Sequence, residues 1–137
     1  MKYPIIKNGE VAASEIENLR AAIGWDNTEG QCQRALENAY CRYIVRFEGK
    51  LIAYLSVISD GVVDAFLVDL MVHPDFQRKG IGTMIVRQAL TDLKDKVQCV
   101  HVTFNPDEKT FYKHIGFYIF KGGIFDYKHM KTDFKQT

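Results

Sequence analysis

The stretch that decides the fold runs from residue 72 to residue 83 and reads Val72-His73-Pro74-Asp75-Phe76-Gln77-Arg78-Lys79-Gly80-Ile81-Gly82-Thr83. Before it, residues 65–72 (AFLVDLMV) are apolar except for Asp69, which is typical of a strand buried on both faces. After it, apolar residues recur on one face of a helix, at Ile81, Ile85, Val86, Ala89, Leu90 and Leu93. The stretch therefore predicts a loop that joins a buried strand to an amphipathic helix.

This loop has the properties of an anion-binding site. Gly80 and Gly82 lack Cβ atoms where the first amide groups of the helix converge, so an anion can approach the backbone closely. The helix dipole adds about half a positive charge at this end, and Arg78 and Lys79 add full charges at the rim. A phosphate or pyrophosphate group fits such a site.

Two common nucleotide motifs do not match the loop. The P-loop needs Gly-x-x-x-x-Gly-Lys-Ser/Thr, which the sequence lacks. The dinucleotide fingerprint needs a third glycine where this chain has Ile85, and it follows a different order of elements. The form that fits is Gln/Arg-x-x-Gly-x-Gly/Ala, present here as residues 77–82 (QRKGIG).

Upstream of the loop the sequence predicts two helices and a hairpin. Residues 3–7 predict a short first strand, and Ser14 with Glu17 has the form of a capping box at the start of a helix that ends at Gly24. Residues 31–40 predict a second short helix. Two strands, residues 43–47 and 51–57, flank the turn Glu48-Gly49-Lys50, and Asp60-Gly61 forms the next turn.

Downstream of the loop the sequence predicts a strand over residues 97–104 and a short helix over 109–115. Strands over residues 117–120 and 124–130 complete the chain, with Gly122-Gly123 between them. The strand–helix–strand unit of residues 65–104 predicts a right-handed parallel crossover beside antiparallel hairpins. The expected fold is α/β (α+β), a mixed sheet with helices on both faces, in a single domain over residues 1–137.

Composition excludes several classes of protein. The chain has 137 residues, 47% of them apolar and 26% charged, with a net charge of +1, which is ordinary for a globular domain. The near-neutral balance argues against nucleic-acid binding. No apolar run approaches the ~20 residues of a membrane span, and the first residues lack the apolar core of a signal peptide.

The cysteines and histidines predict no disulfide framework and no metal site. Cys32, Cys41 and Cys99 are odd in number, and the four histidines lack the spacing of a zinc motif. Reduced thiols indicate a cytoplasmic protein. Each cysteine is interpreted as a small buried apolar group, with a catalytic thiol as the alternative.

Residues 77–82, preceded by Leu70-Met71-Val72-x-Pro74, resemble the pyrophosphate loop of the GNAT superfamily of acyl-CoA-dependent N-acyltransferases. A second segment resembles the same family. Asn105 follows the strand 97–104, and then comes Phe111-Tyr112-Lys113-His114-Ile115-Gly116-Phe117, similar to the family's Asn…(Leu/Phe)-Tyr-x-x-x-Gly-Phe. The matches together span residues 66–117. Glu108 departs from the small residue usual in the family, which puts in doubt how closely that helix start packs on the cofactor.

The resemblance implies a mostly antiparallel sheet with a central parallel pair of strands that splay apart around acetyl-CoA as co-substrate. The backbone of Leu70, Met71 and Val72 is expected to hold the pantetheine amides, and Asn105 and Phe111 to contact the same arm. Lys109 or Lys113 is a candidate for the adenosine phosphates, with a solvated helix lysine as the alternative. The pyrophosphate is expected on seven residues: Gln77, Arg78, Lys79, Gly80, Ile81, Gly82 and Thr83.

The resemblance also assigns catalytic residues. Tyr112 occupies the position of the family's general acid, with an ordinary buried tyrosine as the alternative. Asp69 is a candidate for the base that takes a proton from the amine through water, because a carboxylate in an apolar strand has a raised pKa. A structural hydrogen-bond acceptor is the other interpretation of Asp69.

The expected function is an acetyl-CoA-dependent N-acetyltransferase that acts on the primary amine of a small molecule. The alternatives are a protein Lys or N-terminal acetyltransferase and a non-catalytic acyl-CoA-binding domain. Trp25, flanked by carboxylates in the segment 24–30, is a candidate for binding a cationic amine through its ring, or else it packs the helix end onto the core. The apolar residues of 124–130 predict a homodimer, since an exposed edge strand is normally covered.

Overall fold

The computed structural model describes residues 2–128 and divides the chain into two compact units, Met1–Phe104 and Asn105–Thr137. The first unit contains a five-stranded sheet in the order β1-β2-β3-β4-β5. The first four strands pair antiparallel and β5 runs parallel to β4. The strands span Ile5–Lys7, Cys41–Phe47, Lys50–Ser59, Asp64–Val72 and Cys99–Val102. The predicted mixed, mostly antiparallel sheet is confirmed.

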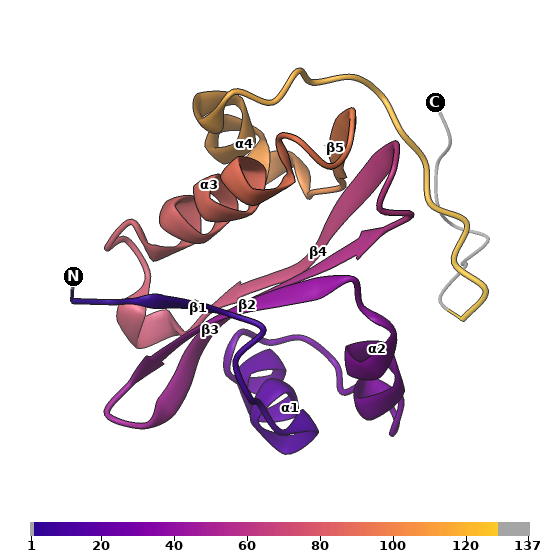
Figure 1. The fold of residues 1–137 in the computed structure, drawn as a ribbon. Coiled ribbons are helices and arrows are strands. Elements are labelled where there is room, and N and C mark those ends of the chain that lie inside the picture. The colour runs from indigo at the N-terminus through magenta and orange to yellow at the C-terminus, as the bar shows by residue number, and fades with distance from the viewer. Residues whose placement is uncertain (1, 129–137) are drawn as a thin grey trace. The chain divides into compact units, whose positions relative to one another are not determined.

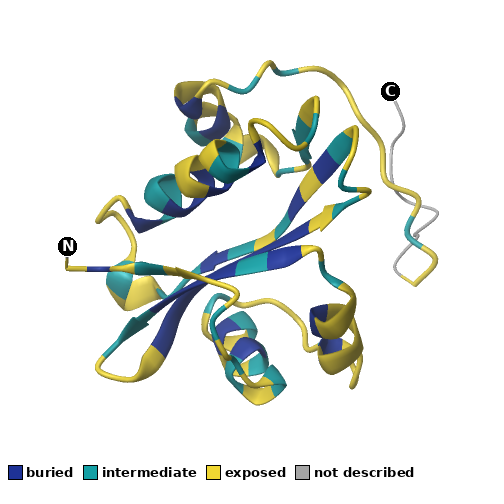
Figure 2. Cartoon of the chain, viewed as in Figure 1, coloured by how far each residue is buried: buried dark blue, intermediate teal, exposed yellow. Residues whose placement is uncertain are grey.

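Helices cover both faces of this sheet, as Figure 1 shows. The helices α1 (Ala13–Ala22) and α2 (Cys32–Asn38) lie on one face, and α3 (Ile81–Leu93) lies on the other. The periodicity of α3 explains its position, because its buried residues form one stripe toward the sheet (Figure 2). One apolar cluster joins α1 and α2 to the sheet: Ile16, Leu19, Cys32, Leu36, Ile44, Leu51, Tyr54 and Met71.

The start of α1 differs from the prediction. Its N-cap is Ala12, whose N–H donates to the Glu15 carboxylate at 3.0 Å. The predicted capping box of Ser14 and Glu17 is wrong, because Glu17 accepts hydrogen bonds from the backbone and hydroxyl of Thr28 instead. The neighbouring Val11 and Ala13 pack on the core, so the helix begins earlier in the chain than the predicted cap at Ser14.

The end of α1 is where the sequence places it. Gly24 has φ +83° and follows the last helical turn. Its N–H donates to the carbonyl of Ala21, and the N–H of Trp25 donates to the carbonyl of Arg20 at 2.9 Å. These two bonds are the Schellman motif, which glycine favours because the left-handed conformation costs it nothing.

β4 contains a bulge that the sequence analysis did not predict. Tyr54 of β3 pairs with Met71, and Ser56 pairs with Val68. The single residue of β3 between Tyr54 and Ser56 therefore lies opposite two residues of β4, Asp69 and Leu70. Asp69 has φ +58°, a left-handed conformation that Asp tolerates better than most residues. Because the strand has one extra residue, Val68 and Met71 lie on the same face of the sheet.

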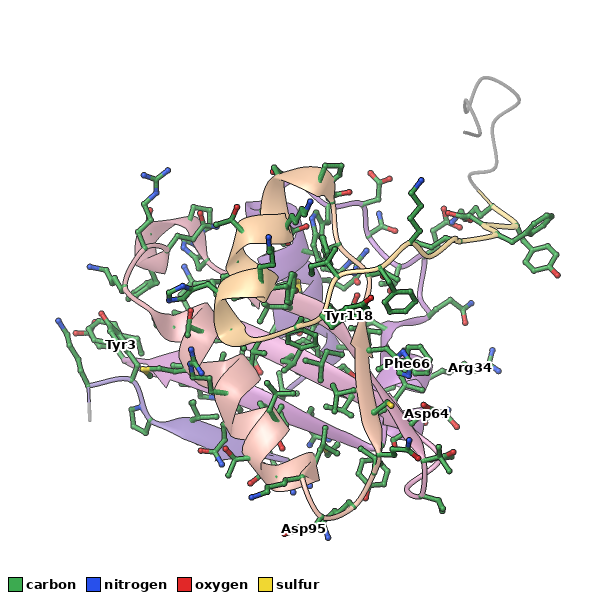
Figure 3. All side chains as sticks on the ribbon, turned by 90° about the horizontal axis from the view of Figure 1, so that it is seen from above. Tyr3, Arg34, Asp64, Phe66, Asp95 and Tyr118 are labelled. Atoms are coloured by element: carbon green, nitrogen blue, oxygen red, sulfur yellow. The ribbon has the colours of Figure 1, made fainter. Side chains whose placement is uncertain are left out.

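The parallel pair β4–β5 is short. Asp64–Leu67 pair with Cys99–Val102, and beyond Leu67 the two strands no longer pair. The His101 ring stacks on Phe66 at 4.6 Å and bonds the Asp64 carboxylate at 2.9 Å; Figure 3 labels Phe66 and Asp64 on β4. These contacts stabilise the paired end. The expected parallel pair is confirmed, and because β5 ends at Val102 the last residues of β4 have no parallel partner among the described strands.

The second unit contains a 3₁₀ turn, Pro106–Glu108, and the helix α4 (Lys109–Ile115), which ends at Gly116 with φ +123°. The strands predicted at residues 117–120 and 124–130 do not form over the described part, which ends at residue 128. An extended segment becomes a strand only by pairing its backbone, and no strand pairs with this one among the described residues. Its large apolar side chains are exposed: Tyr118, Phe120, Ile124, Phe125 and Tyr127.

Within residues 2–128 no helix is both long enough and apolar enough to span a membrane.

Candidate active site

The glycine loop ends at the N-terminus of α3. Gly80 is the N-cap residue, with φ +81° and no side chain that can bond the helix amides. The first bond along the helix runs from the N–H of Met84 to the carbonyl of Gly80, at 3.0 Å. The amides of Ile81, Gly82 and Thr83 come before that bond, so they are free of intrahelical acceptors and can donate to an anion.

The residues before Gly80 hold the loop and supply its charge. The Gln77 side chain donates to the carbonyl of Val72 at 2.9 Å, which ties the loop to the end of β4. Arg78 has φ +62°, and both Arg78 and Lys79 are exposed beside the helix end. The sequence-predicted phosphate-binding residues 77–83 therefore lie together, in the loop before α3 and in the first turn of that helix.

The predicted pantetheine-binding residues lie directly before this loop. Leu70, Met71 and Val72 form the last part of β4, beyond the point where β5 stops pairing with it. Met71 is buried and Leu70 is half-buried. One edge of this strand pairs with β3, and no described strand pairs with the other edge, which leaves backbone groups available to a ligand.

A cavity of about 300 Å³ lies on the α1 and α2 side of the sheet. It is small for a ligand pocket and mostly apolar, with a few polar groups. The polar residues come from α1, β3, β4 and the segment around α2. The lining residues are Ile16, Arg20, Thr28, Cys32, Ala35, Leu36, Asn38, Ala39, Tyr54, Ser56, Ile58, Val68 and Asp69.

The bulge places Asp69 in this cavity. Regular alternation would put Asp69 on the same face as Leu67, away from α1 and α2. The extra residue changes that, and the Asp69 side chain lines the cavity with 46% of its surface exposed. Burial raises the pKa of Asp69, and the guanidinium of Arg20, 3.7 Å away, partly opposes this rise.

Arg20 is a cavity residue that the sequence analysis missed. Its Nε donates to the carbonyl of Asp26 at 2.8 Å, and its guanidinium lies over the Trp25 ring at 5.3 Å. Its helical spacing from Ile16, one turn earlier on the same face, is the signal that points to it. Trp25 itself is partly exposed and is not among the residues that line the cavity.

The remaining predicted site residues belong to the second unit. Tyr112 is buried, and that burial, with the nearby charge of Glu108, raises the pKa of its hydroxyl to about 12. The rings of Phe111 and Phe117 pack edge-on against it. Glu108, the departure from the family pattern, accepts the N–H of Asn105 at 3.0 Å and so fixes the turn before α4.

The described residues contain no group of three or more His, Cys, Asp or Glu placed to hold a metal ion.

A parallel strand pair, a glycine loop at a helix end and a small cavity with a carboxylate are the features that the sequence analysis leads us to expect of an acyltransferase. A family model described as the acetyltransferase (GNAT) family matches residues 11–117. The chain belongs to this family of N-acetyltransferases.

Curated relatives support this assignment. An uncharacterized N-acetyltransferase ycf52 from Gracilaria tenuistipitata var. liui is 27% identical over 85% of this chain and 68% of its own length. Serotonin N-acetyltransferase 2, chloroplastic, from Oryza sativa subsp. japonica is 26% identical over 74% of this chain and 54% of its own length. Because such names place some relatives in the chloroplast, cytoplasmic localisation of this chain stays a prediction.

Solved structures share the fold. A GNAT family acetyltransferase from Streptococcus pneumoniae TIGR4 has a TM-score of 0.79 and 27% identity, covering 92% of this chain and 98% of its own. Glucosamine-6-phosphate N-acetyltransferase from Arabidopsis thaliana has a TM-score of 0.74 and 17% identity, covering 93% of this chain and 99% of its own. The second likeness shows the fold alone.

Proposed function

We propose that this chain transfers an acetyl group from acetyl-CoA to a primary amine of a small molecule by direct attack. The observation that carries the proposal is the position of the Asp69 carboxylate. The bulge of β4 turns it into the cavity, and β4 is also the strand that leads into the glycine loop. A proton acceptor with a raised pKa beside a small cavity is what deprotonation of a bound ammonium group requires.

The residues at the end of β4 and the start of α3 fit acetyl-CoA. The amides of Ile81, Gly82 and Thr83 and the charges of Arg78 and Lys79 suit its phosphates. The free edge of residues 70–72 suits the amides of its pantetheine arm. We assign Asn105 and Phe111 of the second unit to the same arm. When bound, acetyl-CoA supplies a thioester carbonyl carbon for attack and a thiol as leaving group.

Two side chains move the protons in this proposal. An alkylammonium group has a pKa near 10.4, so it must lose a proton before its nitrogen can attack. Asp69 takes that proton through water. The new C–N bond forms as the C–S bond breaks, and Tyr112 donates its hydroxyl proton to the departing sulfur. The raised pKa of Tyr112 keeps its hydroxyl protonated at neutral pH.

The cavity supports a small acceptor. Its volume of about 300 Å³ is at the low end of ligand pockets. A lysine side chain or an N-terminus of a protein could also enter such a cavity, so a protein acceptor is the competing assignment. We also propose that Trp25 takes part in binding the amine. Its ring contacts Arg20, and Arg20 lines the cavity.

The test is release of free CoA thiol upon incubation with acetyl-CoA and a panel of small amines and lysine peptides. We expect turnover with small amines, and acetyl-CoA binding measured by calorimetry. Turnover with peptides only would assign a protein substrate. Binding of acetyl-CoA without turnover of any acceptor would make the chain a non-catalytic acyl-CoA-binding domain.

A further inference from the structure

The acceptor cavity contains a cation as well as a carboxylate, and this pair points to a particular class of acceptor. We propose that the acceptor is a free α-amino acid with an apolar side chain, whose carboxylate binds Arg20 and whose amino group faces Asp69. This inference rests on the proposed function, because it names the acceptor of that same site.

Arg20 has hydrogen-bond donors that the protein leaves available. Its side chain is only 18% exposed, and it lines the cavity. The Nε group donates to Asp26, and the Trp25 ring supports the guanidinium. The two terminal amino groups, Nη1 and Nη2, donate no hydrogen bond to any described protein group. A largely buried guanidinium with open donors fits a carboxylate, which it can bind through two parallel bonds.

Asp69 does not use up these donors. Its Oδ1 lies 3.7 Å from Nη1 of Arg20, which is beyond the length of a hydrogen bond. The two groups are neighbours with opposite charge, and each has capacity for a further partner. A ligand that presents an anion to Arg20 and a cation to Asp69 gives each of these two groups the further partner for which it has capacity.

The short distance between the two groups selects the type of ligand. An α-amino acid bears its ammonium and carboxylate groups on the same carbon atom, so both reach a pair of protein groups 3.7 Å apart. An ω-amino acid with a long spacer holds its charges too far apart. A simple alkylamine brings a second cation beside Arg20 with no anion to accompany it, which costs electrostatic energy at partly buried positions.

The rest of the cavity fits an apolar side chain of modest size. Ile16, Leu36 and Val68 line it, together with the small residues Ala35 and Ala39. Other carboxylates nearby are engaged: the Glu17 carboxylate accepts from the backbone and hydroxyl of Thr28. The cavity therefore offers one anion, one cation and an apolar wall.

The test compares acceptors that differ only in the carboxylate. The pairs are L-leucine with 3-methylbutylamine and L-phenylalanine with phenethylamine, and kcat/KM is measured by CoA release. We expect the wild-type protein to prefer each amino acid at least tenfold, about 1.4 kcal/mol. Arg20→Gln is expected to lower this preference at least tenfold, and Arg20→Lys to keep part of it. Arg34→Gln, a change of an exposed arginine on α2, is the control and keeps the preference.

The preference is a ratio within one protein sample, so it is insensitive to a loss of folded protein in a variant. Calorimetric binding of the same pairs in the presence of CoA gives a second readout that needs no turnover. An Arg20-dependent preference in binding without any turnover would support the inference and overturn the proposed function. Turnover of amines as good as that of amino acids, a preference unchanged in Arg20→Gln, or absence of binding and turnover for every pair would overturn the inference.

Discussion

Asp69 combines an unusual backbone angle with a titratable group. Asp and Asn are the residues that best tolerate a positive φ apart from glycine, so the position restricts the choice of side chain before any chemistry is considered. The carboxylate then adds what an amide lacks, a proton acceptor. Asn at this position therefore separates the chemical role from the structural one.

Asp69→Asn is expected to change the pH dependence of catalysis and leave acetyl-CoA binding unchanged. Burial raises the pKa of Asp69, so the wild-type rate should fall as the pH drops through that raised value and the base becomes protonated. The variant should lose this acid limb and turn over more slowly. Profiles of kcat/KM against pH measure the effect, and an unshifted acid limb would return Asp69 to a structural role.

Thermal unfolding provides the control for this variant. A carboxyl with a raised pKa destabilises the fold when ionised, and this cost appears as the pH rises above the ordinary Asp value. Asp69→Asn should therefore melt at or above the wild-type temperature at neutral pH. A variant that melts far lower would show that the carboxylate supports the bulge itself.

Tyr112→Phe is expected to lower kcat by roughly 100-fold while acetyl-CoA affinity stays close to wild type, because the ring remains and only the proton donor is lost. Steady-state kinetics and calorimetry measure the two quantities. Tyr118→Phe is the matched control, since Tyr118 is an exposed tyrosine nearby in the sequence, and loss of its hydroxyl should change neither kcat nor acetyl-CoA affinity. If Tyr112→Phe keeps the wild-type kcat while the chemical step is rate-limiting, Tyr112 is not the general acid.

At the scale of elements, the loop before α3 is expected to bind acetyl-CoA through its backbone. Gly82→Val places a branched side chain over the amides that precede the first intrahelical bond, and should weaken acetyl-CoA binding at least tenfold, about 1.4 kcal/mol. Calorimetry on a folded variant is the measurement. Gly122→Val is the control, because a Cβ there meets no atom within 4 Å; equal affinities in both variants would contradict the loop's role.

The link between α1 and β2 should make stability depend on pH. The guanidinium of Arg46 bonds both oxygens of Glu15, at 2.6 and 2.9 Å, and lowers the pKa of Glu15 to about 2 from its ordinary 4.5. The pair therefore stabilises the fold fully above pH 4.5 and loses this effect as the pH falls toward 2.

Glu15→Gln is expected to reduce the free energy of unfolding by about 1–2 kcal/mol at pH 7, a value reduced for screening by solvent. Urea unfolding at several pH values measures it, and the difference from wild type should shrink as the pH approaches 2. Glu37→Gln, which removes the charge of an exposed carboxylate whose partner is the uncharged side chain of Gln33, is the control. A difference that stays constant with pH would show that packing, and not the ion pair, is lost.

Local patterns in the sequence predicted most elements, and their failures have physical causes. Gly80 and the apolar periodicity after it predicted the start of α3, and Gly116 marks the end of α4. The Glu48-Gly49 turn is a two-residue hairpin with both φ angles positive, as its composition indicates. The capping box of α1 failed because long-range partners, Arg46 and Thr28, decided which glutamate caps the helix. The cavity carboxylate was found from its polarity. The spacing of Arg20 from Ile16 places it on the inner face of α1, but its contacts with Trp25 and Asp69 form only in the folded chain.

At the scale of the whole molecule, the chain has exposed apolar surface after α4. Ile124, Phe125 and Tyr127 are all exposed, although the strand predicted to contain them does not form over the described residues. We propose that a second copy covers them, since exposed apolar groups in such number mark an interaction site. Sedimentation is expected to show a homodimer at micromolar concentration, and Phe125→Ser with Tyr127→Ser to give a monomer. A wild-type monomer would end this proposal.

The bulge of β4 makes the length of that strand as important as its composition. A substitution at residue 69 changes one side chain, whereas deletion of a single codon there would remove the extra residue and leave a strand that pairs with β3 in regular alternation. Val68 would stay opposite Ser56 and Met71 opposite Tyr54, so Met71 would keep its place in the apolar cluster beneath α1, while the cavity would lose its carboxylate. One extra residue in β4 therefore distinguishes a strand that only builds the core from a strand that also supplies a titratable group to the cavity.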